Sequence, residues 1–214
     1  MADMQHSVAH QGEADDGRLF APAAARNAGA ILTTLTPHLP SSGYALEVAS
    51  GTGEHVIALA KACPDLIWQP TDIDNERLES IAAWTAHSGL PNVAPPLRYN
   101  AVETTWPGPP MDAVFLSNLT HLISKDDAKT LLAHMASALA PGGLLAIYGP
   151  FKRGAAYASE GDARFDDSIR AERPDAGYKD IGWVENQLAS HRLQHQDTIA
   201  MPANNLLTLW KAPS

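Results

Sequence analysis

The chain has a single cysteine, Cys63, so it cannot form an internal disulfide. No apolar run approaches the roughly 18 residues that a membrane span requires, and the N-terminus lacks the basic segment and apolar core of a secretion signal. The 15 lysines and arginines, against 24 acidic residues, form no run that could neutralise several phosphates. These absences predict a cytoplasmic protein that binds neither membranes nor nucleic acid.

Histidine pairs that could ligate a metal from one helix face are also missing. The chain has nine histidines, and two pairs, His6/His10 and His191/His195, have the spacing H-x-x-x-H, but neither pair lies in a predicted helix, where this spacing would place two imidazoles on one face. We therefore expect no metal site.

The length and composition favour one large domain. In a chain of 214 residues, 45% apolar residues are enough to form a substantial core. Residues 1–18 are polar and have no apolar periodicity, which predicts a flexible N-terminal tail before a domain over residues 19–214. The alternative for this segment is a flap that becomes ordered over bound ligand.

Strand and helix patterns alternate along the domain. Strands are predicted over residues 44–49, 66–72, 97–100, 111–117, 144–148, 195–200 and 205–210, and helices over 22–39, 54–63, 74–82, 125–139 and 181–188. Such alternation is typical of an α/β fold with a parallel sheet between helices. The last two strands are separated by only a few residues, so they must be antiparallel. The prediction is a three-layer, Rossmann-like, seven-stranded, mostly parallel sheet with a C-terminal antiparallel hairpin, as in class I methyltransferases.

The turn after the first strand contains Gly51 and Gly53 and leads into a helix. Glycines there let the backbone approach a ligand at the helix N-terminus. The third glycine of the dinucleotide pattern G-x-G-x-x-G is missing, and Glu47 stands four positions before Gly51. A carboxylate at this point would repel a pyrophosphate but suits the ammonium group of S-adenosylmethionine. The segment resembles the methyltransferase pattern acid-x-G-x-G-x-G with Ala49 at the first glycine; the alternative is an ordinary strand-to-helix turn.

Polar residues at the ends of later strands fit the same cofactor. Asp72 follows Gly53 by 19 residues at the end of the second strand, where a carboxylate can accept both ribose hydroxyls. Asp74 shares that role or caps the next helix. Asn100 stands where an acid often contacts the adenine amino group, and its side-chain oxygen can accept the same bond. The expected cofactor contacts are Glu47, Ala49, Ser50, Gly51, Gly53, His55, Asp72, Ile73, Asn100, Ala101 and Asn118.

Seven segments between about residues 20 and 211 together resemble the sequences of one particular family. They read PAAARN (22–27), LEVASGTGEH (46–55), WQPTDID (68–74), NLTH (118–121), YGPF (148–151), FDDSIR (165–170) and MPANN (201–205). Together they resemble the domain-of-unknown-function 938 family of class I S-adenosylmethionine-dependent methyltransferases, which includes the methyltransferase-like 26 proteins. The resemblance implies the fold and the cofactor but no substrate. Asn100 departs from the aspartate expected at its position.

Candidate catalytic residues follow the fourth and fifth strands. Methyl transfer is an in-line displacement at a sulfonium, which needs an aligned nucleophile and sometimes a base. His121 has the pKa range of a base, and Tyr148 is the second candidate. The structural alternatives are a histidine bonded to local backbone and a buried strand aromatic.

Residues 149–179 have no long apolar periodicity, and we interpret them as a loop that acts as a substrate lid. The expected acceptor contacts are Arg26, Asn27, His121, Phe151, Arg170 and Asn204. For these residues the alternatives are a local helix cap at residues 26–27, a lid-closing ion pair at Arg170 and turn hydrogen bonds at Asn204.

The leading hypothesis is an S-adenosylmethionine-dependent methyltransferase that acts on oxygen, nitrogen or sulfur of a small molecule and releases S-adenosylhomocysteine. A protein or RNA methyltransferase is less favoured because the signature Asn/Asp-Pro-Pro-aromatic is absent, with Asn-Leu-Thr-His in its place. A non-catalytic cofactor-binding protein and an NAD-dependent oxidoreductase are the remaining alternatives. The sequence does not predict an oligomeric state.

Overall fold

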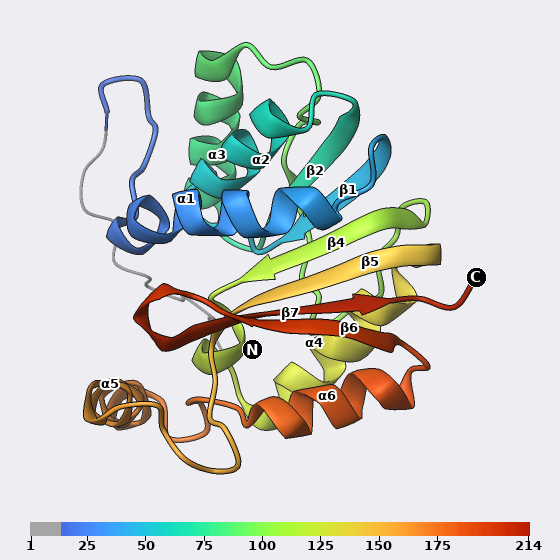
Figure 1. The fold of residues 1–214 in the computed structure, drawn as a ribbon. Helices are drawn as coiled ribbons and strands as arrows, with labels where there is room; N and C mark the ends of the chain where they lie inside the picture. Colours follow the sequence, from blue (N-terminus) through green and yellow to red (C-terminus); the bar gives the residue numbers. More distant parts are fainter. Residues whose placement is uncertain (1–13) are drawn as a thin grey trace. The chain divides into compact units, whose positions relative to one another are not determined.

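The computed structural model describes residues 14–214, so the first 13 residues of the predicted tail lie outside the described part. The chain divides into two compact units, unit 1 ending at Asn100 and unit 2 comprising Ala101–Ser214. In Figure 1, unit 1 is blue to green, and unit 2 runs from green to red. Each unit is described by itself.

Unit 1 contains three α-helices and three strands within its described residues. They are α1 (Pro22–Leu35), β1 (Gly43–Val48), α2 (Glu54–Ala62), β2 (Leu66–Asp72), α3 (Asn75–Ser88) and β3 (Leu97–Arg98), with the 3-10 helix η1 (Thr36–His38) after α1. The strands are parallel and lie in the order β3-β2-β1. Because parallel strands start and end at the same edges, the residues that follow β1 and β2 come together.

Local sequence features define the ends of these elements. Pro22 occupies the first turn of α1, where a missing N–H does no harm. The Asp74 carboxylate accepts the N–H of Glu76 at 2.9 Å and so caps α3, as one of the two readings of Asp74 predicted. Gly89 ends α3 in the left-handed conformation, with φ 63°.

A buried asparagine connects α2 to β2. The Asn92 side chain is 5% exposed, and its Nδ2 donates to the carbonyls of Ala60 (2.9 Å), Cys63 (3.1 Å) and Leu66 (3.1 Å). Ala60 lies in the last turn of α2, and Cys63 is the residue that caps this helix, so both carbonyls lie at the helix end, where helical N–H donors run out. One side chain therefore satisfies the helix end and holds it to the start of β2.

Unit 2 contains three α-helices and four strands. They are β4 (Met111–Ser117), α4 (Lys125–Ser137), β5 (Leu139–Pro150), α5 (Glu160–Glu172), α6 (Ile181–Ser190), β6 (Gln194–Ala200) and β7 (Asn205–Lys211), with the 3-10 helices η2 (Thr120–Leu122) and η3 (Pro202–Asn204). The order is β4-β5-β7-β6, in which β4 and β5 are parallel and β7 is antiparallel to both of its neighbours. The predicted antiparallel C-terminal pair is confirmed.

Two predictions about unit 2 were wrong. Leu139 does not extend α4; it begins β5 opposite Met111, and a register shift separates this pair from Ala113 and Leu144. The cause is a tight bend at the glycines, where a Cβ on Gly143 would lie 2.9 Å from two backbone carbonyl oxygens.

Residues 149–179 are also not a single loop, because α5 lies within them. Only Asp166 is buried on this helix, so no apolar stripe announces it. In Figure 1 α5 stands apart from the strands of its unit, whereas α4 and α6 lie along them.

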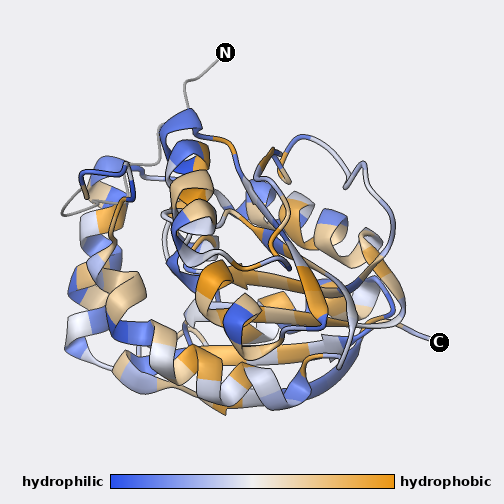
Figure 2. Cartoon of the chain, turned by 90° about the horizontal axis from the view of Figure 1, so that it is seen from above, coloured by the Kyte–Doolittle hydropathy of each residue, from blue (hydrophilic) through white to orange (hydrophobic). Residues whose placement is uncertain are grey.

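The predicted fold class is confirmed: the chain is an α/β protein with seven mostly parallel strands and a C-terminal antiparallel pair within residues 14–214. Figure 2 shows hydrophobic residues concentrated in the strands, while the helices carry both kinds. Within the described residues, the helices lack the combination of length and apolar character that crossing a membrane requires.

We expect Asn92→Ala to lower the free energy of unfolding by about 2–3 kcal/mol, since the carbonyls of Ala60, Cys63 and Leu66 lose the hydrogen bond from its Nδ2. Urea denaturation measures this change. Asn186→Ala on the exposed face of α6 is the control and should change stability by less than about 0.5 kcal/mol. Equal effects of the two substitutions would contradict the proposed role of Asn92.

Candidate functional site

The turn between β1 and α2 has three residues in the left-handed conformation. Ala49 has φ 53°, Gly51 φ 58° and Gly53 φ 96°. Glycine is required at position 53 for two reasons. Its φ lies in the left-handed region, and a Cβ there would lie 3.1 Å from the Cα of Ile81 on α3. Ala49 stands where the methyltransferase pattern has its first glycine, and it adopts the backbone conformation that favours glycine. The predicted glycine turn is therefore present, with one strained residue, and its role toward a cofactor stays a prediction.

The carboxylate of Asp72 holds this turn. Its Oδ2 accepts the N–H of Gly51 at 2.9 Å, and its Oδ1 accepts the N–H groups of Ile73 (2.8 Å) and Asp74 (3.1 Å). A carboxylate offers about four acceptor positions, so about one remains, on Oδ2. The pKa of Asp72 is raised, because burial outweighs these hydrogen bonds and the charge of Arg77. In this arrangement Asp72 can accept one further hydroxyl rather than two.

Glu47 is the most unusual residue of unit 1. Its side chain is 1% exposed, and neither carboxylate oxygen has a hydrogen-bond partner among the described residues. Burial raises the pKa of Glu47 to about 8; the nearby Ser50 side chain opposes this shift, and the charge of Asp72 adds a smaller contribution in the same direction as burial. A buried carboxylate without a partner is costly, and a cationic ligand would relieve that cost.

Two residues predicted for different roles contact each other. His55, in the first turn of α2, is 7% exposed, and its Nε2 lies 2.8 Å from Oδ1 of Asn27 on α1. Burial lowers the pKa of His55 to about 4, so the imidazole is neutral near pH 7 and donates to the asparagine. Arg26, predicted beside Asn27, is exposed on α1. The structure thus brings His55 and Asn27 together at the end of the turn.

The other predicted cofactor residues lie at strand ends. Ser50 donates its N–H to Thr71 at 2.7 Å, which joins the turn to β2. Asn100 follows β3 as the last residue of unit 1. In unit 2, Ala101 is buried, and its carbonyl lies 2.8 Å from Nδ1 of His134.

In unit 2, Asn118 follows β4 with φ 55° and donates its N–H to Tyr148 at 2.9 Å. His121 lies in η2 with a side chain that is 5% exposed, and its buried Nδ1 has no hydrogen-bond partner within residues 14–214. Its ring contacts Tyr178 and Phe165, with centroids 6.0 and 6.1 Å away. Burial, with a smaller contribution from Lys179, lowers the pKa of His121 to about 3. The imidazole is therefore neutral and a weak base in this state.

Asp166 on α5 is the shared acceptor of a hydrogen-bond network in the predicted lid, residues 149–179. Its carboxylate is fully buried and accepts the hydroxyl of Tyr157 (2.5 Å), the N–H of Tyr178 (2.5 Å) and Nε of Arg170 (2.9 Å), and Nζ of Lys152 lies 3.5 Å away. Burial raises the pKa of Asp166, but these hydrogen bonds and the charge of Arg170 outweigh burial and lower it. The segment is held in place by a charged network.

The remaining predicted acceptor residues have structural partners. Arg170 pairs with Asp166, and its guanidinium occupies the space beside Gly177 that a Cβ would need. Asn204 donates to Oδ2 of Asp162 at 3.0 Å and so joins the hairpin turn to the start of α5. Phe151 is 1% exposed. The roles of these residues toward an acceptor stay predictions.

Tyr148, the second catalytic candidate, is 1% exposed. Its hydroxyl accepts a hydrogen bond from Nδ2 of Asn205 at 2.9 Å, across the β5–β7 pair. A catalytic role for this phenol stays a prediction.

The sequence analysis missed Lys179, Ser80 and Glu54. Lys179 is 6% exposed, and its Nζ donates to the carbonyls of Ile123 (2.5 Å) and Gly177 (2.9 Å), which fastens the lid segment to the residues after η2. Burial lowers its pKa to about 8. Ser80 and Glu54 contact the glycine turn, as described below. Ser80 and Arg77 lie on the buried face of α3 beside Ile81, and polar residues on such a face were the available signal.

No three His, Cys, Asp or Glu side chains converge within residues 14–214 in a way that could hold a metal ion.

Comparison with known proteins gives a family and a set of similar folds. The profile of the family described as "Protein of unknown function (DUF938)" matches residues 18–212. Among solved structures, an O-methyltransferase family 2 protein from Planctomyces limnophilus in complex with apigenin has 20% identity and a TM-score of 0.75, and the match covers 88% of this chain and 59% of that one. Human N-acetylserotonin methyltransferase in complex with SAM has 13% identity and a TM-score of 0.72, with 90% and 53% covered.

The YcgJ protein from Bacillus subtilis has 12% identity and a TM-score of 0.67, with 89% of this chain and 99% of that chain covered. At such identities the likeness is one of fold. The chain spans a little over half the length of the first two solved structures, with 59% and 56% of them covered.

We expect Ala49→Gly to leave the free energy of unfolding unchanged or to raise it by up to about 1 kcal/mol. Relief of the left-handed alanine is worth about 1–2 kcal/mol, and the greater freedom of glycine in the unfolded chain offsets part of it. Ala45→Gly in β1 is the control; Ala45 is buried in extended backbone and should lose about 1 kcal/mol. Chemical denaturation of both variants decides the matter, and an equal loss in both would refute strain at Ala49.

Asp166→Asn should ease local opening of α5 by about 2–3 kcal/mol at pH 7, because the charged hub of the lid network is lost. Hydrogen exchange of the α5 amides measures this, with the exposed Asp167→Asn as control. Since the folded pKa of Asp166 is lowered, its contribution is present above the ordinary value near 3.8 and disappears as the pH falls below it. The Asn variant should lack that acid sensitivity; identical profiles would contradict the hub role.

Proposed function

Since the chain belongs to the family described as protein of unknown function (DUF938), whose name states no activity, we propose that it is an S-adenosylmethionine-dependent methyltransferase with a small-molecule acceptor. Glu47 carries this proposal. A carboxylate that is 1% exposed and has no partner among the described residues marks the place of a cation, and the ammonium group of S-adenosylmethionine supplies one. The pyrophosphate of NAD would instead be repelled.

The rest of the β1–α2 turn fits the same cofactor. Gly51 leaves the backbone open to a ligand, because a Cβ there would meet only the end of Arg77 at 3.6 Å. Asp72 keeps about one acceptor position on Oδ2 for a ribose hydroxyl. Ile73 and Asn100 follow β2 and β3, and we assign them to the adenosine part, with the amide oxygen of Asn100 as acceptor for the adenine amino group.

Other predicted contacts remain part of the proposal with narrower roles. Ala49, Ser50 and Gly53 shape the turn, and His55 supports it through Asn27. Ala101 and Asn118, in unit 2, remain predicted cofactor contacts.

When bound, S-adenosylmethionine supplies a sulfonium methyl group to a nucleophile by in-line displacement. We assign the acceptor contact to His121, whose buried Nδ1 has no partner within residues 14–214. With its pKa lowered to about 3, the neutral imidazole orients an acceptor by a hydrogen bond better than it removes a proton. An acceptor that loses its proton readily fits this site best. Several proteins of similar fold are named O-methyltransferases, which favours a hydroxyl acceptor.

Calorimetric titration with S-adenosylhomocysteine and, separately, with NAD tests the cofactor. We expect S-adenosylhomocysteine to bind and to release close to one proton at pH 7, because Glu47, with a pKa of about 8 in the free protein, ionises opposite the ammonium group. Affinity should rise about tenfold per pH unit between pH 6 and 7.5 and level off above pH 8. Titrations in buffers of different ionisation enthalpy measure the proton.

Glu47→Gln should abolish both the proton release and the pH dependence, whereas the exposed Glu79→Gln should keep them. Binding of NAD alone would refute the proposed function. Binding of S-adenosylhomocysteine with the same proton release in Glu47→Gln would remove Glu47 from the cofactor site.

A further inference from the structure

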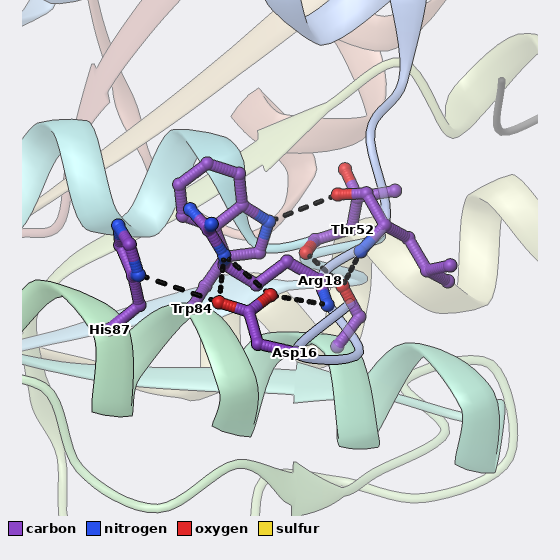
Figure 3. A network of polar contacts seen from close by, with 7 residues as sticks. Asp16, Arg18, Thr52, Trp84 and His87 are labelled. Atoms are coloured by element: carbon purple, nitrogen blue, oxygen red, sulfur yellow. Dashed lines mark hydrogen bonds and ion pairs between the residues drawn. The ribbon is translucent and has the colours of Figure 1, made fainter. Parts of the chain in front are cut away.

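Residues 14–21 precede α1 and lie along α3; we call them the strap. The guanidinium of Arg18 lies 4.6 Å from the ring centroid of Trp84, and its Nε is 2.9 Å from the carboxylate of Asp16 (Figure 3). Nε1 of Trp84 donates to the carbonyl of Leu19 at 3.0 Å. Nδ1 of His87 lies 3.4 Å from Asp16. The strap is thus anchored on α3 by a cation–π contact, a hydrogen bond and the contact between Asp16 and His87.

Two backbone N–H groups of the strap end on side chains of other elements. The N–H of Leu19 donates to Oγ of Ser80 on α3 at 2.9 Å. The N–H of Ala21 donates to Oε2 of Glu54, the first residue of α2, at 2.7 Å. Both strap residues are buried, so neither N–H has water as an alternative partner.

The same two side chains hold Thr52, the residue between Gly51 and Gly53. Oγ of Ser80 donates to the carbonyl of Thr52 at 2.8 Å, and the hydroxyl of Thr52 donates to Oε2 of Glu54 at 2.8 Å. Thr52 is 3% exposed, and Ser80 is fully buried. The glycine turn is therefore held at its central residue, from the main chain and from the side chain.

These four hydrogen bonds form one connected network. Ser80 has a single hydroxyl proton, which goes to Thr52, and its oxygen accepts from Leu19; Glu54 uses one oxygen for both of its partners. Release of the strap leaves both side chains with an unused acceptor position and exposes the buried face of α3. The turn, with three left-handed residues, depends on such outside support.

We propose that Ser80 and Glu54 are positioning residues for the cofactor, and that through Thr52 they couple the seating of the strap to the conformation of the glycine turn. The proposal rests on the assignment of this turn to S-adenosylmethionine. Coupling between two sites is reciprocal, so cofactor binding stabilises the seated strap by the factor by which the strap strengthens binding.

Arg18→Ala is the decisive variant, because Arg18 anchors the strap through Asp16 and Trp84, both of which lie outside the glycine turn. In the full chain we expect it to weaken S-adenosylhomocysteine binding about 5-fold or more, and to speed hydrogen exchange at Gly51 and Gly53 in the ligand-free protein. In the wild-type protein, S-adenosylhomocysteine should slow exchange at Leu19 and Ala21 by a similar factor. The exposed Glu79→Ala on α3 is the control and should change none of these values.

A second pair of variants separates positioning from mere stability. Glu54→Ala should weaken S-adenosylhomocysteine binding and speed exchange at Ala21. Glu54→Gln should restore both, because its amide oxygen still accepts from Ala21 and Thr52. Ser80→Ala should resemble Glu54→Ala, with faster exchange at Leu19.

The proposal is overturned if Arg18→Ala speeds exchange only within the strap, with affinity and exchange of the turn unchanged. It is also overturned if Glu54→Gln is as impaired as Glu54→Ala. Failure of the proposed function looks different, since the wild-type protein would then bind no S-adenosylhomocysteine. Exchange at Gly51 and Gly53 in ligand-free Arg18→Ala would still decide whether strap and turn are coupled.

Discussion

The hydrogen bond from the N–H of Gly51 to the carboxylate of Asp72 joins the turn after β1 to the end of β2. It exists because β1 and β2 are parallel and end at the same edge of the sheet. The bond fixes the left-handed turn and brings the negative charge of Asp72 close enough to raise the pKa of Glu47. Two acidic side chains therefore lie in one buried region: Asp72 accepts backbone N–H groups, and Glu47 has no hydrogen-bond partner among the described residues.

Unit 2 uses its charges in the opposite way. Asp166 is as buried as Glu47, but its hydrogen bonds and Arg170 satisfy it and lower its pKa. The charge of Asp166 stabilises α5 and the segment around it, whereas Glu47, with a pKa of about 8, is largely protonated at pH 7 and in our proposal ionises when the ligand binds. The difference lies in partners rather than in burial, and it separates a structural carboxylate from a binding one. In unit 2 the buried Nδ1 of the neutral His121 likewise has no hydrogen-bond partner within residues 14–214, which is why we propose it as a binding group.

The sequence was sufficient to predict the succession of strands along the chain and the turn at Gly51, because strand periodicity and glycine spacing are local signals. It did not reveal α5, whose only buried residue is a charged one, Asp166. It also could not show that Arg170 is engaged with Asp166, or that Ser80 reaches both Leu19 and Thr52. Such pairings depend on how helices pack, and neither hydrophobic pattern nor residue spacing encodes them.

The strap has a consequence for the order in which the protein folds. Leu19 and Ser80 are 61 residues apart in the sequence, and Leu19 and Trp84 are 65 apart. Closing so long a loop is slow compared with forming a helix, so the strap can seat only after α3 has been synthesised and has docked. During translation, Thr52 leaves the ribosome well before Ser80, one of the two side chains that hold it. The glycine turn is thus encoded early in the chain but completed late in folding.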